Sequence, residues 1–234
     1  APAERADVIV DFTNVAVGTN IIVQNIAPDS PYGGGVLGVD FTAADPDSTG
    51  QVMQFSVVAA VGADNSTPAA NLVFPGFKPI EPAVDTIRPL SLNELDSASV
   101  RVMTDAAGNI TAACADPAAL PFGPVAAMLG NLNPDGTGMP LRWMDPITEK
   151  PAMGTTEVWQ IHNFTMDAHP IHIHLVQFQV LNRQNAAGVV RPPELWETGR
   201  KDTVIAYPDE ITRVRAFFDR AGLYTWHCHI VEHE

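Results

Sequence analysis

Cysteine and positive charge are both scarce in this chain of 234 residues. It has two cysteines, Cys114 and Cys228, which excludes a scaffold held together by several disulfides. Lysine and arginine together number 13 against 27 acidic residues, giving a formal net charge of −14. This balance argues against a nucleic-acid partner, which requires a basic surface, and favours solubility and the attraction of cations or neutral phenols.

Long apolar runs are also absent. No segment reaches about eighteen uninterrupted apolar residues, so we expect no membrane span. The first four residues carry neither a basic nor an apolar run, so we expect no signal peptide within the chain. Hydrophobic residues make up 46%, and 17 Gly and 20 Pro are spread along the sequence. This composition is typical of a globular, mostly β protein.

Histidine is infrequent but strongly clustered. The chain has 7 histidines, and all except His162 fall in two short windows. The first window, HPIHIH, contains His169, His172 and His174, and the second, HCHIVEH, contains His227, Cys228, His229 and His233. Core packing gives no reason to assemble one thiol and several imidazoles so densely. The pattern therefore predicts a copper site.

The spacing within the two windows predicts two metal centres. The residues around each window have strand composition, and side chains in a strand alternate between its faces. His172 and His174 then share one face while His169 tends toward the other, and Cys228 points away from both of its flanking imidazoles. We expect one centre with His169, Cys228 and His233, and another with His172, His174, His227 and His229.

The two donor sets suit different chemistry. One cysteine with two histidines is typical of a blue-copper electron-transfer centre, whereas imidazoles alone suit copper that meets oxygen. Because Cys228 is covalently joined to His227 and His229, an electron at the sulfur has a path of one residue to the other centre. The pattern thus indicates a redox enzyme.

These motifs resemble those of a known family. HCHIVEH is similar to the HCHIxxH copper signature of three-domain multicopper oxidases, and HPIHIH is similar to the motif that precedes it, in the style of the bacterial spore-coat laccase and bilirubin oxidase branch. Less specific similarities are ERADVIVDF (4–12), PYGGG (31–35), EVWQIHNFTMDAHPIHIH (157–174) and KDTV (201–204). The resemblance covers most of the chain, although only the two histidine-rich motifs are highly specific.

The resemblance implies a role for each ligand. His169, Cys228 and His233 would hold the mononuclear type 1 copper. His172 would bind type 2 copper, and His174, His227 and His229 would bind the binuclear type 3 pair. Cys228 would pass electrons between the centres, and Glu234 would deliver protons for oxygen reduction.

The resemblance also implies an activity and its partners. A laccase-like oxidase couples one-electron oxidation of phenolic, aromatic amine or metal-ion substrates to the four-electron reduction of O2 to water. The family uses four HxH pairs, of which this chain supplies two, so we expect an amino-terminal part of the same oxidase to supply the other four His ligands. The axial type 1 ligand would follow Glu234. A secreted, periplasmic, or spore or cell-surface location is expected.

The predicted fold is all-β: a cupredoxin-like Greek-key β-sandwich, with one complete domain and part of a second. We assign residues 1–61 to the later part of a middle domain, 62–86 to a linker and 87–234 to a carboxyl-terminal domain that carries the copper ligands. Residues 112–140 are expected to form an irregular or partly helical insertion. The expected strands are 7–12, 20–25, 51–58, 88–95, 99–104, 157–164, 171–182, 203–207, 212–218 and 222–228.

Several alternatives stay open. The 169–174 cluster alone also suits a zinc site or a polar patch. A copper-containing nitrite reductase, a blue-copper electron-transfer protein, and a copper-storage or coat protein would share part of the pattern. We expect His162 to be structural and hydrogen-bonded to backbone, and Cys114 to be a free thiol. Asp202 is a candidate acceptor for a ligand imidazole, with an ion pair to Lys201 or Arg200 as the alternative.

Overall fold

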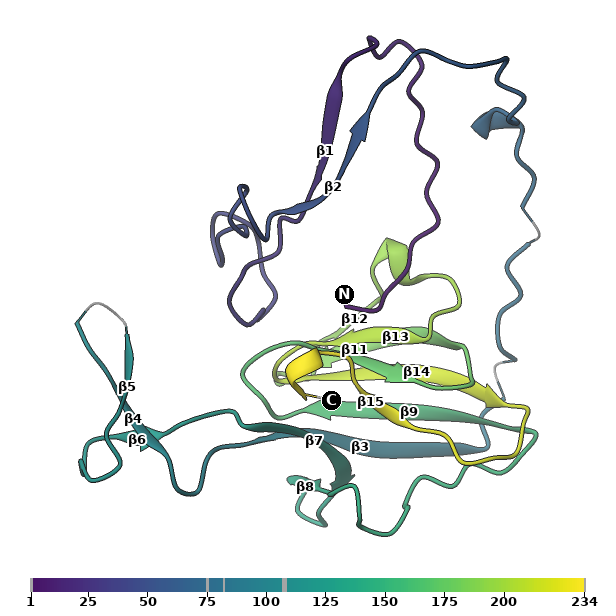
Figure 1. Ribbon diagram of the computed structural model, residues 1–234. Coiled ribbons are helices and arrows are strands. Elements are labelled where there is room, and N and C mark those ends of the chain that lie inside the picture. Colours follow the sequence, from purple (N-terminus) through teal and green to yellow (C-terminus); the bar gives the residue numbers. More distant parts are fainter. Residues whose placement is uncertain (1, 75, 82, 107–108, 234) are drawn as a thin grey trace. The chain divides into compact units, whose positions relative to one another are not determined.

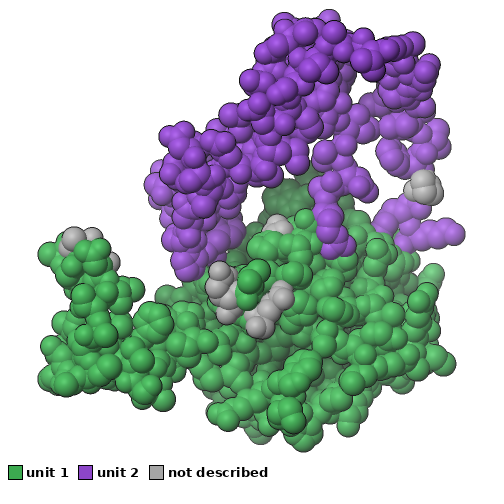
Figure 2. Space-filling model, in the orientation of Figure 1, with its two compact units in different colours: residues 1–4, 79–234 green, residues 5–78 purple. Residues whose placement is uncertain are grey.

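The computed structural model describes residues 2–74, 76–81, 83–106 and 109–233, and it divides into two units. One unit comprises residues 5–78, and the other comprises residues 1–4 together with 79–234 (Figure 2). Within the described ranges, every element longer than three residues is a β-strand. The predicted all-β class is therefore confirmed.

The smaller unit is built around one β-hairpin. β1 (Asn20–Gln24) pairs antiparallel with β2 (Gln51–Ser56), and a short 3-10 helix, η1 (Ala69–Asn71), lies further along (Figure 1). Both strands were predicted, but the strand expected at 7–12 is wrong, because these residues form no ladder. Val8 and Ile9 are 74% and 59% exposed, whereas Phe12 packs edge-to-face on Phe55 of β2, so only the end of this apolar segment contacts the hairpin.

The larger unit contains a seven-stranded sheet with the order β12-β11-β14-β9-β3-β7-β8. Neighbours are antiparallel except β3 and β9, which run parallel. The strands are β3 (Thr86–Leu95), β7 (Ala126–Leu132), β8 (Gly138–Pro140), β9 (Thr155–Asn163), β11 (Phe178–Asn185), β12 (Val190–Arg191) and β14 (Glu210–Phe218).

A second, three-stranded sheet packs on the first. Its order is β13-β10-β15, with β10 (His169–Ile173) between β13 (Thr203–Ala206) and β15 (Trp226–Cys228). Apolar side chains of both sheets form one buried cluster, which makes the unit a β-sandwich. Each fully buried Leu or Phe in it contributes about 1.5–3 kcal/mol. The cluster includes Leu90, Leu92, Ile161, Phe178 and Val214 from the large sheet and Ile171, Val204, Ala206 and Cys228 from the small one.

The region 112–140 departs from its prediction. Residues 113–119 and 122–125 are irregular, as predicted, but no helix forms in this region. Instead it contains β7 and β8, and β7 pairs with β3 from Ser91–Gly130 to Leu95–Ala126. Gly130 explains why the strand is hard to recognise, because a Cβ there would lie 2.0 Å from the Met139 carbonyl oxygen. Close backbone approach required the glycine, and glycine weakens the strand pattern.

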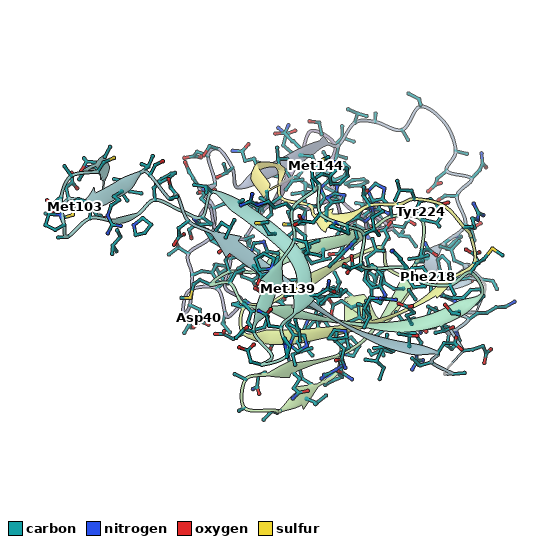
Figure 3. All side chains as sticks on the ribbon, turned by 90° about the horizontal axis from the view of Figure 1, so that it is seen from below. Asp40, Met103, Met139, Met144, Phe218 and Tyr224 are labelled. Atoms are coloured by element: carbon teal, nitrogen blue, oxygen red, sulfur yellow. The ribbon has the colours of Figure 1, made fainter. Side chains whose placement is uncertain are left out.

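Between β3 and β7 the chain forms a separate three-stranded sheet. It consists of β4 (Arg101–Thr104), β5 (Ile110–Ala112) and β6 (Leu120–Pro121), in the order β5-β4-β6. Met103 marks this sheet in Figure 3, whereas Phe218 marks the sandwich. Ile110 and Leu120 on its strands are 62% and 70% exposed.

The strand predicted at 171–182 is two strands. β10 ends at Ile173 and β11 begins at Phe178, and between them Leu175 has a left-handed φ of 72°. The break lets the chain cross from the small sheet to the large one, so a continuous run of strand-forming residues spans two layers. The strand expected at 222–228 is also shorter than predicted, because β15 covers only Trp226–Cys228.

Candidate metal centre

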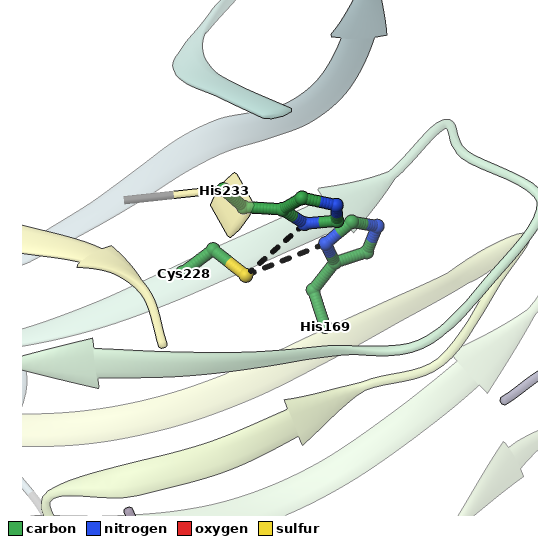
Figure 4. A group of neighbouring side chains, drawn as sticks. All are labelled: His169, Cys228 and His233. Carbon is green, nitrogen blue, oxygen red and sulfur yellow. Dashed lines mark hydrogen bonds between the residues drawn. The ribbon is translucent and has the colours of Figure 1, made fainter. Parts of the chain in front are cut away.

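The first cluster gathers one sulfur and two imidazoles. The Cys228 Sγ atom lies 3.5 Å from His169 Nδ1 and 3.7 Å from His233 Nδ1 (Figure 4). β15 supplies Cys228, β10 supplies His169, and a 3-10 turn, η3 (Val231–His233), supplies His233. His169 is 0% exposed and Cys228 is 4% exposed. We call these three residues the cysteine cluster.

Hydrogen bonds orient the His169 ring. Its Nε2 lies 3.1 Å from Asp167 Oδ1 and 2.9 Å from Thr165 Oγ1. Nε2 therefore donates to Asp167, which directs Nδ1 at the sulfur. Burial alone would lower the pKa of His169, but hydrogen bonds to Asp167 and Cys228 outweigh it and raise that pKa to about 9. A metal ion at Nδ1 would have to displace a proton there.

Two carboxylates beside His169 escaped the sequence analysis. Asp167 accepts from the ring, and Glu94 Oε1 lies 3.4 Å from His169 Nε2. Glu94 Oε1 is buried and has no hydrogen-bond partner in the described structure. Burial and the charge of Asp167 raise the pKa of Glu94, whereas hydrogen bonding to His169 lowers the pKa of Asp167 against the effect of its own burial. One sequence signal could have identified Glu94. It follows Leu90 and Leu92 at every second position of the strand, so a carboxylate occupies the face that these leucines bury.

The second cluster contains only imidazoles. Ring nitrogens of His172, His174 and His227 all lie within 4.8 Å of one another, and the two Nε2 atoms of His174 and His227 are 3.1 Å apart. β10 and β15 pair with His172 opposite His227. The His229 ring joins this group, with its centroid 5.1 Å from that of His227 and 5.8 Å from that of His172. We call these four residues the imidazole cluster.

Backbone carbonyls orient two rings of the imidazole cluster. His172 Nδ1 donates to the Asp202 carbonyl oxygen at 2.7 Å and lies 3.1 Å from Thr203 Oγ1. His227 Nδ1 donates to the Cys228 carbonyl oxygen at 2.9 Å. In both rings Nε2 is left to face the cluster. Burial, together with the charges of His174 and His227, lowers the pKa of His172, so the ring favours the neutral form that binds metal.

The structure refines the role expected of Asp202. The residue does orient the His172 imidazole, but through its backbone carbonyl, while its carboxylate accepts from Thr203 Oγ1 at 3.2 Å. Of the two cations in the alternative prediction, Lys201 forms an ion pair with Glu4.

The remaining predicted residues have varied outcomes. Cys114 is an exposed free thiol and Cys228 a buried one, so the prediction that they are not bridged is confirmed. The prediction of a hydrogen-bonded His162 is wrong for one nitrogen, because Nε2 is buried without a partner in the described structure, while the ring stacks on Phe164. Burial and then Arg213 lower the pKa of His162. Glu234 lies outside the described residues.

The two clusters occupy opposite faces of β15. Cys228 turns into the sandwich core, and its neighbours His227 and His229 turn toward His172. A thiolate with two imidazoles is a soft donor set that suits one copper ion, and the imidazole cluster suits copper without sulfur. No helix in the described part of the chain is long and apolar enough to cross a membrane.

Comparison with known proteins gives a consistent result. Residues 123–234 match the family described as multicopper oxidase. The chain is 34% identical over 248 aligned residues to the laccase of Bacillus subtilis (strain 168), covering 100% of this chain and 40% of that protein. It is 27% identical to the multicopper oxidase LPR1 of Arabidopsis thaliana over 276 residues, covering 100% of this chain and 40% of that protein. The chain thus spans about 40% of the length of these curated relatives.

Solved structures support the fold. The 2F4 variant of the McoA multicopper oxidase from Aquifex aeolicus aligns with a TM-score of 0.55 at 24% identity, over 96% of this chain and 40% of that one. A multi-copper oxidase from Pediococcus acidilactici aligns with a TM-score of 0.53 at 19% identity, over 96% of this chain and 34% of that one. At such identities these likenesses establish the cupredoxin-like fold alone.

Proposed function

Residues 123–234 of this chain belong to the multicopper oxidase family, and we propose that the chain forms the part of a laccase-like oxidase that carries electrons from a reducing substrate toward O2. One observation carries the proposal. Cys228 faces His169 and His233, while the residues on either side of it face the imidazole cluster. One strand therefore serves two donor sets of different chemistry.

The donors present fit copper at both clusters. In the cysteine cluster the sulfur and both Nδ1 atoms converge, and the other nitrogen of His169 is already hydrogen-bonded. We assign His169, Cys228 and His233 to type 1 copper and His172 to type 2. His174, His227 and His229 are assigned to type 3. Bound copper would supply one-electron redox chemistry at the first cluster and the site of oxygen reduction at the second.

The chain's own residues perform three tasks. Thr165 and Asp167 hold the His169 ring so that Nδ1 faces the sulfur. Cys228 joins the clusters through its own backbone, since its carbonyl accepts from the His227 ring at 2.9 Å. We assign proton delivery for oxygen reduction to the Glu234 carboxyl group, as the resemblance implies.

The carboxylates beside His169 favour a cationic reductant. A cation near Glu94 and Asp167 would relieve the repulsion that, after burial, raises the pKa of Glu94, and would occupy a carboxylate oxygen that accepts no hydrogen bond in the described structure. Among phenols, aromatic amines and metal ions, a metal ion is therefore the reductant that these two carboxylates suit best. The net charge of −14 acts in the same direction.

The complete oxidase needs further ligands. We propose that residues 1–61 belong to a middle cupredoxin domain, 62–86 to a linker and 87–234 to a carboxyl-terminal domain. An amino-terminal part of the same oxidase would supply four more histidines to the imidazole cluster. O2 and a small reducing substrate are the proposed partners, and a secreted, periplasmic, or spore or cell-surface location is proposed from the relatives.

Metal analysis and oxygen uptake test this function together. The oxidase that contains this chain, loaded with copper, should bind about four copper ions per molecule and show the blue thiolate-to-copper band. It should consume O2 when a phenol or a metal ion is supplied. One or two copper ions without oxygen uptake would contradict the proposal and favour a nitrite reductase or a blue-copper electron carrier. Zinc in place of copper would contradict both.

A further inference from the structure

Arg183 is a charged residue with no exposure to solvent. Its side chain is 0% exposed, and two of its nitrogens donate to Glu197, each at 2.6 Å. Nε and a terminal nitrogen also reach the Ile205 carbonyl oxygen, at 3.3 and 2.9 Å. A buried guanidinium is costly unless its donors are satisfied, so these contacts fix its place closely. The arginine joins β11 to both Glu197 and β13.

The Ile205 carbonyl lies at the free edge of the small sheet. β13 is the outer strand of that sheet, and Ile205 stands opposite Pro170 of β10. The Pro170 carbonyl accepts from the His229 N–H at 2.7 Å, on the β15 side of β10. The pair Pro170–Ile205 therefore exchanges no ladder bonds, and the Ile205 carbonyl points away from β10, where Arg183 caps it.

The same segment orients His172. Thr203 stands opposite His172 in the ladder, and His172 Nδ1 donates to the carbonyl of the preceding Asp202 at 2.7 Å. Glu197 is the last residue of η2 (Leu195–Glu197), and its carboxylate also accepts from the Glu194 N–H at 3.0 Å in a capping box. Arg183 thus hydrogen-bonds to residues 197 and 205. These lie before and after the 202–203 segment that binds the His172 ring.

We propose that Arg183 is a positioning residue for His172, which it holds in a metal-binding orientation through Glu197 and the Ile205 carbonyl. This inference rests on the proposed function, in which His172 binds type 2 copper. His169, on the same β10 strand, has its ring held by Asp167 and Thr165, which lie outside β13. Loss of Arg183 should therefore affect the two clusters unequally.

Arg183→Met in the copper-loaded oxidase tests the proposal, with Arg191→Met as the matched control. Both guanidinium groups lie over the Tyr207 ring, at 5.1 and 5.2 Å from its centroid, so both variants lose that contact. Arg191 donates hydrogen bonds to Glu210 and Glu194 instead of to β13. We expect about 10-fold weaker retention of type 2 copper in Arg183→Met, measured by EPR during titration with a chelator. The blue band should persist in both variants.

Arg183→Lys provides a second variant if the methionine variant does not fold. Lysine keeps a charge opposite Glu197 but lacks the fork that also reaches Ile205, so its retention of type 2 copper should fall between those of Arg183→Met and the wild type. Wild-type retention in Arg183→Lys and Arg183→Met, or equal losses in Arg183→Met and Arg191→Met, would overturn the proposal. A wild-type oxidase without any type 2 signal would overturn the proposed function itself.

Discussion

The cysteine cluster and the imidazole cluster lie one residue apart in the chain but in different surroundings. His169 and Cys228 are buried in or against the sandwich core, and carboxylates stand behind His169. In the imidazole cluster, His174 is exposed and His172 and His227 are partly so. Both sets of donors converge within this chain, but the second is more open to solvent. This difference fits the proposal that an amino-terminal part of the oxidase supplies further ligands to the imidazole cluster.

The alternation of side chains along a strand is sufficient to place the two clusters in different surroundings. Neighbouring residues of a strand face opposite sides, so β15 places Cys228 in the core and His227 on the other face without a special turn. Under the proposed function, the same alternation would separate the sulfur from the copper ions that react with oxygen. The covalent backbone between Cys228 and His227 would still connect the two clusters for electron transfer.

Removing the sulfur should have the largest effect and separate the clusters. Cys228→Ser should abolish the blue band and the oxidation of substrates, because serine offers no thiolate to copper. The imidazole cluster should still bind copper detectable by EPR. Cys114→Ser is the matched control, since Cys114 is an exposed free thiol, and it should stay blue and active. A Cys228→Ser protein that remains blue would refute the assignment.

A substitution beside the cysteine cluster should affect that cluster and leave the imidazole cluster unchanged. Glu94→Gln removes a carboxylate beside His169 and should raise the KM for Mn²⁺ about fivefold, equivalent to about 1 kcal/mol at a partly exposed site. The KM for a neutral phenol should be unchanged, which serves as the control within the same variant. Steady-state oxygen uptake measures both values. Equal increases for the two substrates would show that Glu94 is structural and does not attract cations.

The sequence predicted which side chains gather in each cluster, because they are close together in the chain. Each histidine-rich window lies within a few residues, and alternation along a strand placed Cys228 opposite its neighbours. His174 reached the expected group by a different route, since it follows the end of β10 and is not part of the strand. The sequence did not predict Glu94, which lies on β3 and meets His169 only through tertiary folding. β7 was missed for a related reason, because its glycine serves a close contact with β8.

The smallest predicted effect lies away from both clusters, at His162. Burial and then Arg213 lower the pKa of His162, so the folded protein resists a proton that the unfolded chain accepts near pH 6.5. Its contribution to stability is present above about pH 6.5 and is lost as the pH falls.

His162→Gln should therefore lose less free energy of unfolding than the wild type between about pH 7.5 and about pH 5, measured by denaturant titration. Phe164→Leu removes the stacked ring but keeps the imidazole, and should retain the acid sensitivity. An unchanged pH dependence in His162→Gln would show that this histidine does not sense pH.

Anomalous diffraction at the copper absorption edge tests the separation of the two clusters most directly. Crystals of the copper-loaded oxidase should show one peak beside the Cys228 sulfur, shared with His169 and His233. Separate peaks should lie on the opposite face of β15, among His172, His174, His227 and His229. A single ion bound by the sulfur together with both flanking imidazoles would contradict the account.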